Sequence, residues 1–419
     1  MQIDVMEAKH IIHTLKNGVI PDANPDLLCL GRDSIVKEMD RCLDLAEEGS
    51  GSVKFISGEY GSGKSFMLNK IRQQAVGRNF AVSRLQINKG FNFSSFDVLY
   101  YTIMHNLATR LTGADGTDFE GLFKDWIESL KNNLTKNQAF DHINGVVASL
   151  NNFNSSFARA FLTFIRSRIS REQELANAAA SWIKGERNIP AALKAKFDVK
   201  GDIDRHTSID SLKAFIHLLK LIGCKGLVVL VDELELVMGL RSDIRRSCYE
   251  NLRYILDNTF GGDFGNCLFV FASTDELFQD NEKGIRAYHA LYQRLGEAIS
   301  KSPSHMQDMR QPVLPLPRLT KDELLILTGR IADIHIAAYS WKPSISAEAL
   351  RNWTLLTLNK EKGGAFPINT REFIKKLVEI LDILEQNPGY NLFNTELKIV
   401  NKNGADTFVN VLSKKDSDG

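Results

Sequence analysis

Cysteine is scarce in this sequence, and its pattern gives no support for a cysteine-held metal. The five cysteines form no CxxC pair and no spacing typical of a bound metal ion. An odd and scattered set favours reduced thiols in the core of a cytosolic protein. The cysteines are Cys29, Cys42, Cys224, Cys248 and Cys267.

Long apolar runs and a targeting signal are also missing. No apolar stretch approaches the length of a membrane span, and the N-terminal MQIDVMEAKHIIHTL places acids before its apolar residues, unlike a signal peptide. The formal net charge of +1 means that any nucleic-acid surface has to come from local charge clustering. We expect a soluble, cytoplasmic protein with no membrane partner.

What is present is a globular composition with alternating strand and helix patterns. Hydrophobic residues make up 43% and charged residues 25% of the 419 residues, so a sizeable core is possible. The alternation predicts a parallel sheet covered on both faces. We predict strands over 53–58, 80–87, 226–235 and 267–274, with a final one within 311–319. We predict helices over 5–18, within 27–49, over 64–75, 95–111, 208–223, about 242–258, about 284–299, and throughout the region after Thr320.

A complete phosphate-binding motif follows the first predicted strand. Residues 58–65 read GEYGSGKS and fit GxxxxGK[ST] in full. Glycines let the loop turn its N–H groups toward phosphate oxygens, and the following helix directs its positive dipole end at the same anion. A chance match is the alternative, which the flanking strand and helix argue against. We predict that ATP and Mg²⁺ bind to Gly58, Glu59, Tyr60, Gly61, Ser62, Gly63, Lys64 and Ser65, with Lys64 on the β- and γ-phosphates and Ser65 on the magnesium ion.

An acidic pair ends the apolar run LVVLVDE at residues 227–233. Asp232 is expected to hold Mg²⁺ directly or through water, and Glu233 to polarise the attacking water as a general base. Both roles need the C-terminal edge of the sheet, where α/β proteins bind ligands. The alternative is an ordinary strand followed by acidic loop residues, and we assign Glu235 to the surface or to a partner contact.

The next buried strand ends in two hydroxyl residues, Ser273 and Thr274. A hydroxyl there, that of Thr274 in particular, could hold the lytic water beside the γ-phosphate. The alternative is a strand-end cap for the helix that follows.

Several arginines are candidates for contacts to the nucleotide. Arg294, in ALYQRLGEAI, could project toward the γ-phosphate of a neighbouring subunit, and Arg286 is a weaker candidate of the same type. Arg371, in NTREFIKKL, could reach back over the nucleotide. Each has the alternative of a solvated helix charge. Gly31 and Arg32, in LGRD, are expected near the adenine; the alternative is a plain loop into a helix.

Together these motifs resemble the AAA+ superfamily, especially its initiator-like and signalling-ATPase relatives, over roughly residues 28–385. Residues 8–110 are more closely similar to the ATP-binding proteins of bacterial BREX phage-defence systems, the BrxC and BrxD type. The strings AKHIIHTLKNGVIP, LCLGRD and FISGEYGSGKSFML carry this likeness. The resemblance implies a bacterial cytoplasmic ATPase encoded in an antiviral locus.

The expected fold is therefore α/β: a P-loop AAA+ core with a parallel sheet, a helical insertion and a C-terminal helical lid. Residues 1–30 are assigned to an N-terminal helix and connector, and residues 31–318 to the core. The insertion covers about 113–205, the lid 319–400 and a polar tail 401–419. The insertion is long for a minimal AAA+ module, and no complete winged-helix domain is apparent after the lid.

Two functional hypotheses are favoured. The first is ATP hydrolysis by a homo-oligomer that acts on double-stranded DNA or on other defence-system proteins. The second is a slow nucleotide-dependent switch whose closed lid, held through Arg371, is recognised by a partner protein. A small-molecule kinase is a weaker third hypothesis, because no acceptor pocket is evident. No NKxD-type guanine reader is present, which favours ATP.

A basic stretch in the insertion is the candidate DNA surface. Binding there would weaken steeply with salt, and a solvated helical surface is the alternative. The stretch contains Arg166, Arg168, Arg171, Lys184, Arg187, Lys194, Lys196 and Lys200.

Overall fold

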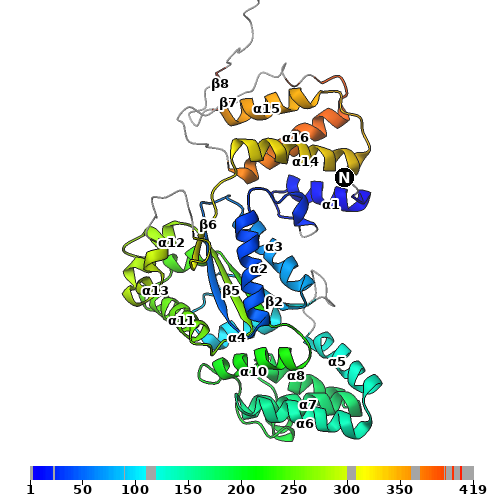
Figure 1. Cartoon of the computed structure of the whole chain (residues 1–419), viewed down its shortest axis with the longest axis vertical. Helices are drawn as coiled ribbons and strands as arrows, with labels where there is room; N and C mark the ends of the chain where they lie inside the picture. Colours follow the sequence, from blue (N-terminus) through cyan, green and yellow to red (C-terminus); the bar gives the residue numbers. More distant parts are fainter. Residues whose placement is uncertain are drawn as a thin grey trace, which may run out of the picture. The chain divides into compact units, whose positions relative to one another are not determined.

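The chain forms two compact units in a computed structural model (Figure 1). The core unit spans Gly31–Arg318, and the helical unit combines Met1–Leu30 with Leu319–Gly419. No helix in the described part of the chain has both the length and the apolar character that a bilayer span requires. The structure describes residues 3–21, 24–88, 90–109, 119–299, 308–359, 369–390, 392, 399–400 and 406–407.

A six-stranded sheet forms the centre of the core unit. Its strands are β1 (Ser52–Ser57), β2 (Ala81–Gln86), β3 (Leu107–Ala108), β4 (Leu227–Asp232), β5 (Cys267–Ser273) and β6 (Val313–Pro315). The order is β3-β2-β4-β5-β1-β6, and every neighbouring pair except β2 with β3 is parallel. The carboxyl ends of β1, β4 and β5 therefore meet at one edge, which we call the carboxyl edge.

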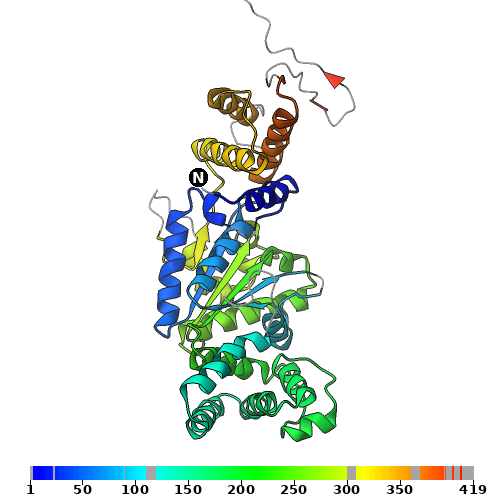
Figure 2. The same ribbon diagram turned by 90° about the vertical axis from the view of Figure 1, so that its right-hand side faces the viewer.

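Alternating side chains place a hydrophobic core on each face of the sheet. Every residue of β4 is buried; Val229 faces one core and Leu230 faces the other. This confirms the prediction of a sheet covered on both faces. The helices α2 (Asp33–Glu47) and α3 (Lys64–Gly77) cover the Leu230 face (Figure 2). The Val229 face is covered by α4 (Phe96–His105), α10 (Ser208–Leu221), α11 (Ser242–Phe260) and α13 (His289–Ile299).

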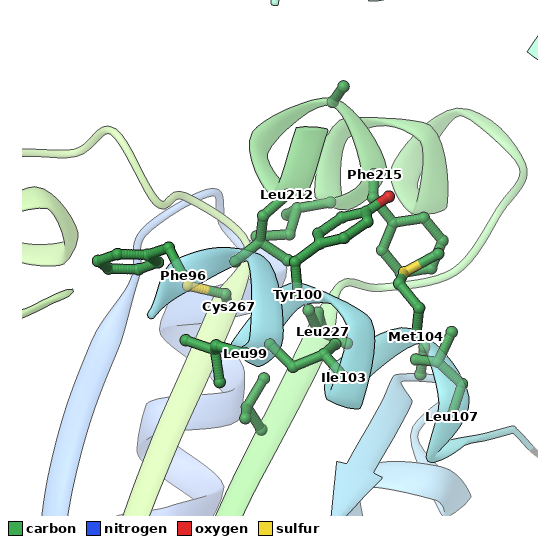
Figure 3. Packing of buried hydrophobic residues seen from close by; sticks show 14 of the residues in the cluster. Phe96, Leu99, Tyr100, Ile103, Met104, Leu107, Leu212, Phe215, Leu227 and Cys267 are labelled. Carbon is green, nitrogen blue, oxygen red and sulfur yellow. The ribbon is translucent and has the colours of Figure 1, made fainter. Parts of the chain in front are cut away.

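The helical insertion packs onto α4 and α10. Figure 3 shows Tyr100 of α4 against Leu212 and Phe215 of α10, and its hydroxyl donates to the carbonyl of Ile183 at 2.5 Å. Lys213 of α10 pairs at 3.1 Å with Asp263, which precedes β5. The insertion therefore lies toward the edge of the sheet opposite to the carboxyl edge (Figure 1). Its helices are α5 (Phe119–Asn133), α6 (Lys136–Leu150), α7 (Ser155–Ser170), α8 (Gln173–Ile183) and α9 (Ala191–Lys196).

The prediction of one helix over 95–111 is wrong at its C-terminal end. The helix α4 ends at His105, and Leu107–Ala108 form β3 instead. Asn106 leaves the helical conformation and its side chain donates to the carbonyl of Thr102 at 2.8 Å, which ends the helix. Beyond it, β3 covers the otherwise unpaired edge of β2. Residues 110–118, where the insertion was expected to begin, lie outside the described residues.

The helical unit contains α1 (Val5–Lys16), α14 (Lys321–Tyr339), α15 (Ala347–Asn359) and α16 (Thr370–Gln386). The helix α1 packs against both α14 and α16. A short antiparallel pair, β7 (Ile399–Val400) with β8 (Asp406–Thr407), shows that the expectation of an all-helical C-terminal part is wrong there. The rest of the predicted polar tail lies outside the described residues.

A buried histidine joins the helices of this unit. His335 on α14 is fully buried, and its Nε2 lies 3.0 Å from the carboxylate of Asp382 on α16. Trp341 Nε1 donates to His335 Nδ1 at 3.0 Å. Because the indole can only donate, Nδ1 accepts and the ring carries its proton on Nε2. Lys16 of α1 binds the other oxygen of Asp382 at 2.7 Å.

Candidate nucleotide site

The phosphate loop, residues 58–65, connects the end of β1 to the first turn of α3. Gly63, immediately before the helix, has φ +100°, a conformation that side chains other than glycine rarely adopt. A Cβ on Gly58 would lie 2.5 Å from the carbonyl oxygen of Leu316 and 2.7 Å from Ser62 Oγ. Glycine is therefore required at both positions. At Gly63 the reason is the backbone conformation, and at Gly58 it is the lack of space for a side chain.

Two polar groups of this loop are buried at the start of α3. Lys64 is 8% exposed, and its Nζ donates to the carbonyls of Gly58 at 2.9 Å and Glu59 at 3.2 Å. Ser62 is 3% exposed, and its hydroxyl has no hydrogen-bond partner among the described residues. A buried hydroxyl without a partner is costly unless a ligand satisfies it. Both groups suit an anion held at the N-terminus of a helix.

The acidic pair lies on the same edge of the sheet. Asp232 is the last residue of β4. It lies two residues after Leu230 and therefore on the same face of the sheet, the face that α3 covers. The Glu233 N–H donates to the Asp232 carboxylate at 3.0 Å, and Glu233 itself has φ +61°. A non-glycine residue held in this region costs about 1–3 kcal/mol, and such strain gathers at functional sites.

Between the phosphate-loop strand and the acidic strand lies β5. Ser273 pairs in register with Ser57, and its carbonyl accepts the Gly58 N–H at 3.2 Å. The buried Thr274 hydroxyl that follows has no hydrogen-bond partner among the described residues. The fold thus places Thr274 at the edge that the phosphate loop and the acidic pair share.

Three charged residues that the sequence analysis did not select lie at this edge. Arg84 on β2 approaches the Asp232 carboxylate at 3.8 Å, and the Ser57 hydroxyl donates to Asp275. Arg318 pairs with Glu59 of the phosphate loop at 2.5 Å. None of these three residues belongs to a sequence motif. The one signal that could have identified them is their position on or just after the strands of the sheet.

Arg32 lies against the phosphate loop. It is 6% exposed, and its Nη2 donates to the carbonyl of Ser62 at 3.2 Å and of Pro317 at 2.5 Å. Gly31 precedes it with φ +64°. These contacts join Arg32 to the loop backbone. That Gly31 and Arg32 lie near the adenine stays a prediction.

The structure places Arg294 away from its own phosphate loop. It binds the Asp257 carboxylate through two nitrogens, one at 2.8 Å, and these bonds raise the pKa of Arg294. Asp257 is in the last turn of α11, near Thr259, whose methyl group lies beside Gly51 before β1. This is the edge opposite to the carboxyl edge. Arg286 is exposed in the 3-10 turn Ile285–Ala287.

Arg371 belongs to the helical unit, in the first turn of α16. A Cβ on Gly18 would lie 3.5 Å from its side-chain carbons, so Arg371 runs beside the end of α1. An open pocket of about 510 Å³ lies elsewhere in this unit, between α14 and α15, and contains none of the predicted site residues.

Three of the eight residues in the basic stretch of the insertion are paired with acids. Lys184 pairs with Glu186 at 2.7 Å, and Lys194 pairs with Asp202 at 3.0 Å. Arg187 pairs with Asp97 at 2.5 Å. Paired charges contribute less to a positive field, so these contacts favour the solvated-surface alternative.

The residues at the carboxyl edge fit a nucleotide-bound magnesium ion. No cluster of three or more histidine, cysteine, aspartate or glutamate side chains suited to a metal occurs in the described part of the chain. Magnesium needs no such cage when phosphates supply ligands, because one or two protein oxygens then suffice. Ser65 in the first turn of α3 and Asp232 at the end of β4 can offer these oxygens.

Comparison with known proteins decides the family. A family model described as BREX system ATP-binding protein BrxC/D matches residues 3–398. The chain belongs to this family. The resemblance to the BREX ATP-binding proteins is thereby confirmed. The mostly parallel sheet likewise confirms the expected α/β core.

Other comparisons give weaker likenesses. No curated protein matches the sequence. The chain is similar to the ORC2 protein of Aeropyrum pernix in its ADPNP-ADP complexes, with 13% identity and a TM-score of 0.34 over 84% of this chain and 68% of that one. The ADP form of the same protein gives 13% identity and a TM-score of 0.33 over 87% and 71%.

Proposed function

We propose that this BREX-family protein is a magnesium-dependent ATPase whose active site is the carboxyl edge of the core-unit sheet. The observation that carries the proposal is the convergence of three segments at this edge. These are the phosphate loop after β1, the acidic pair after β4 and the Thr274 hydroxyl after β5. We assign residues 31–318 to the ATPase core and residues 319–400 to its lid.

Each residue of the site has a role that its position supports. Lys64 turns from the loop carbonyls to the β- and γ-phosphates, and the loop N–H groups bind phosphate oxygens. Ser65 and Asp232 would hold magnesium, which would neutralise charge on the β- and γ-phosphates. Glu233 takes a proton from water as the water oxygen attacks the γ-phosphorus. The bond to the β–γ bridging oxygen breaks, giving ADP and phosphate.

The remaining candidates act around this centre. Thr274 positions the attacking water through its buried hydroxyl. Arg371 reports on the nucleotide from the lid, and Gly31 with Arg32 borders the adenine side of the loop. Arg294 acts on a neighbouring subunit in a homo-oligomer, after its bond to Asp257 opens.

The decisive test is ATP turnover by the wild type and by Glu233→Gln, with and without double-stranded DNA, over a series of protein concentrations. We expect Glu233→Gln to bind ATP but to lose turnover by about 10²–10⁴-fold. Glu235→Gln, an acid of the same turn, is the matched control and should retain wild-type turnover. Equal turnover in wild type and Glu233→Gln would refute the assignment of the base.

A slow nucleotide-dependent switch is the second candidate. The bidentate bond between Arg294 and Asp257 favours it, because that arginine is already bound within its own chain. Tight ATP binding with negligible turnover, at every concentration and with DNA present, would support the switch. Turnover per subunit that rises with concentration and with DNA would support the oligomeric ATPase.

We further propose a cytoplasmic role in antiphage defence, in which the protein acts on DNA or on other defence-system proteins. Its family carries this proposal. Because acids pair with three of the eight residues in the basic stretch, we favour a protein partner over DNA. DNA affinity that falls steeply between 50 and 200 mM salt would reverse this preference.

A further inference from the structure

The chain passes between the two units at Leu30–Gly31 and again at Arg318–Leu319, and the second of these connections is bonded to the phosphate loop. This connector, residues 316–319, follows β6 and contains Arg318, the last residue of the core unit. The Leu316 N–H donates to the carbonyl of Ser57 at 2.6 Å. The carbonyl of Leu316 in turn packs so closely on Gly58 that no Cβ fits between them.

Two charged side chains add further links. The buried guanidinium of Arg32 spans from the Ser62 carbonyl in the loop to the Pro317 carbonyl in the connector. Glu59 in the loop pairs with Arg318. Both bonds leave the same nitrogen, Nη2. The directions of its two N–H groups are fixed by the guanidinium plane, whereas the N–H groups of a lysine ammonium rotate freely. Arg32 thus fixes the separation of two backbone segments.

Nucleotide binding acts on the same residues. Lys64 Nζ is bonded to the carbonyls of Gly58 and Glu59, which are the two loop residues that touch the connector. When Lys64 turns to a phosphate, those carbonyls lose a donor, but several loop N–H groups gain charged acceptors. The N–H bonds gained to phosphate oxygens outnumber the two lysine–carbonyl bonds that are lost, so the loop becomes more rigid overall.

We propose that Arg32 and the Glu59–Arg318 pair couple the phosphate loop to the connector, so that ATP binding suppresses local opening of residues 316–319. The inference rests on the proposed ATP site and deepens it. Arg32 is a positioning residue, which acts through the Ser62 and Pro317 carbonyls. The side chain of Glu59 is 60% exposed, so its ion pair with Arg318 contributes little to the stability of the fold. Its role is to hold Arg318 beside the phosphate loop.

Amide hydrogen exchange of the full chain, with and without a non-hydrolysable ATP analogue and Mg²⁺, tests the proposal. Residue 317 is a proline and has no amide hydrogen, so Leu316, Arg318 and Leu319 are the reporters. We expect the analogue to slow their exchange roughly tenfold in the wild type, as one added charge-assisted hydrogen bond would. Calorimetry with the same analogue measures binding separately.

At analogue concentrations that saturate each variant by its own binding curve, Arg32→Lys and Glu59→Gln should lose most of this slowing. Arg41→Lys is the matched control, because Arg41 lies on α2, the helix that Arg32 precedes, and binds the side chain of Glu38 instead of a loop carbonyl. It should keep the wild-type response. Glu59 is exposed, so Glu59→Gln decides the matter if Arg32→Lys fails to fold.

The outcomes separate this inference from the proposed function. A wild type that binds no analogue would overturn both. A wild type that binds the analogue with unchanged exchange at the reporters would overturn the coupling alone. Full slowing in both Arg32→Lys and Glu59→Gln would do the same, and would leave the ATP site standing.

Discussion

Replacing Glu38 by glutamine should lower the free energy of unfolding of the core unit by about 3 kcal/mol. Glu38 on α2 pairs with Lys54 on β1 at 2.6 Å, and their side chains are 5% and 4% exposed. Removing one partner of a buried pair costs about 3–5 kcal/mol, because the other charge stays buried. Lys54 keeps its backbone acceptors, which sets the low end of this range. These acceptors are the carbonyls of Met309, Arg310 and Gln311, at 2.9–3.2 Å.

The same pair predicts a pH dependence. Burial alone would raise the pKa of Glu38, but the hydrogen bonds from Arg41 and Lys54 outweigh it and lower the pKa. The folded pKa therefore lies below the unfolded value of about 4.3. The carboxylate contributes its stability above the unfolded pKa and loses it as the pH falls through the folded pKa. The difference between wild type and Glu38→Gln should be full at pH 7 and shrink below about pH 4.

Urea unfolding followed by circular dichroism measures both effects. Glu48→Gln is the matched control, since Glu48 follows the same helix with an exposed side chain, and it should change stability by less than about 0.5 kcal/mol. A loss below about 1 kcal/mol in Glu38→Gln at pH 7 would show that the pair is solvated and refute the reasoning.

Four further predictions concern the site and the buried polar groups. Asp232→Asn should weaken ATP binding in the presence of Mg²⁺ and leave metal-free binding unchanged, as calorimetry at both conditions would show. Asp257→Ala should preserve or raise turnover by releasing Arg294, whereas Arg294→Ala should abolish turnover without abolishing ATP binding. Burial raises the pKa of Cys248 to about 12, so its thiol should react with a disulfide reagent at pH 8 only after unfolding. Trp341→Phe removes the donor to a buried histidine nitrogen and should cost about 1–3 kcal/mol, measured by thermal melting.

Each of these has a contrary result. Equal weakening of ATP binding with and without Mg²⁺ would remove Asp232 from the metal site. Equal loss of turnover in Asp257→Ala and Arg294→Ala would make their bond structural. Rapid labelling of Cys248 in the folded protein would contradict its burial, and an unchanged melting temperature in Trp341→Phe would mean that water replaces the indole.

The phosphate loop and the acidic pair could be predicted because their chemistry is local. A strand, eight residues and a helix N-terminus are contiguous in the chain, so the string GEYGSGKS was sufficient to predict the loop between β1 and α3. The apolar run of β4 likewise predicted a strand buried on both faces. The end of α4 could not be predicted, because the partner of β3 is the edge of β2 and not a neighbour along the helix.

By itself, the sequence determined the family, the α/β alternation and the segments proposed for phosphate and acid chemistry. Only the tertiary structure decided what each arginine touches. Arg32 meets Pro317, 285 residues later, because β6 returns beside β1, and Arg294 meets Asp257 because α11 and α13 pack together. A long charged side chain makes its contacts at its tip, several bonds from the backbone. Its partner therefore depends on how distant segments fold together, which no local pattern encodes.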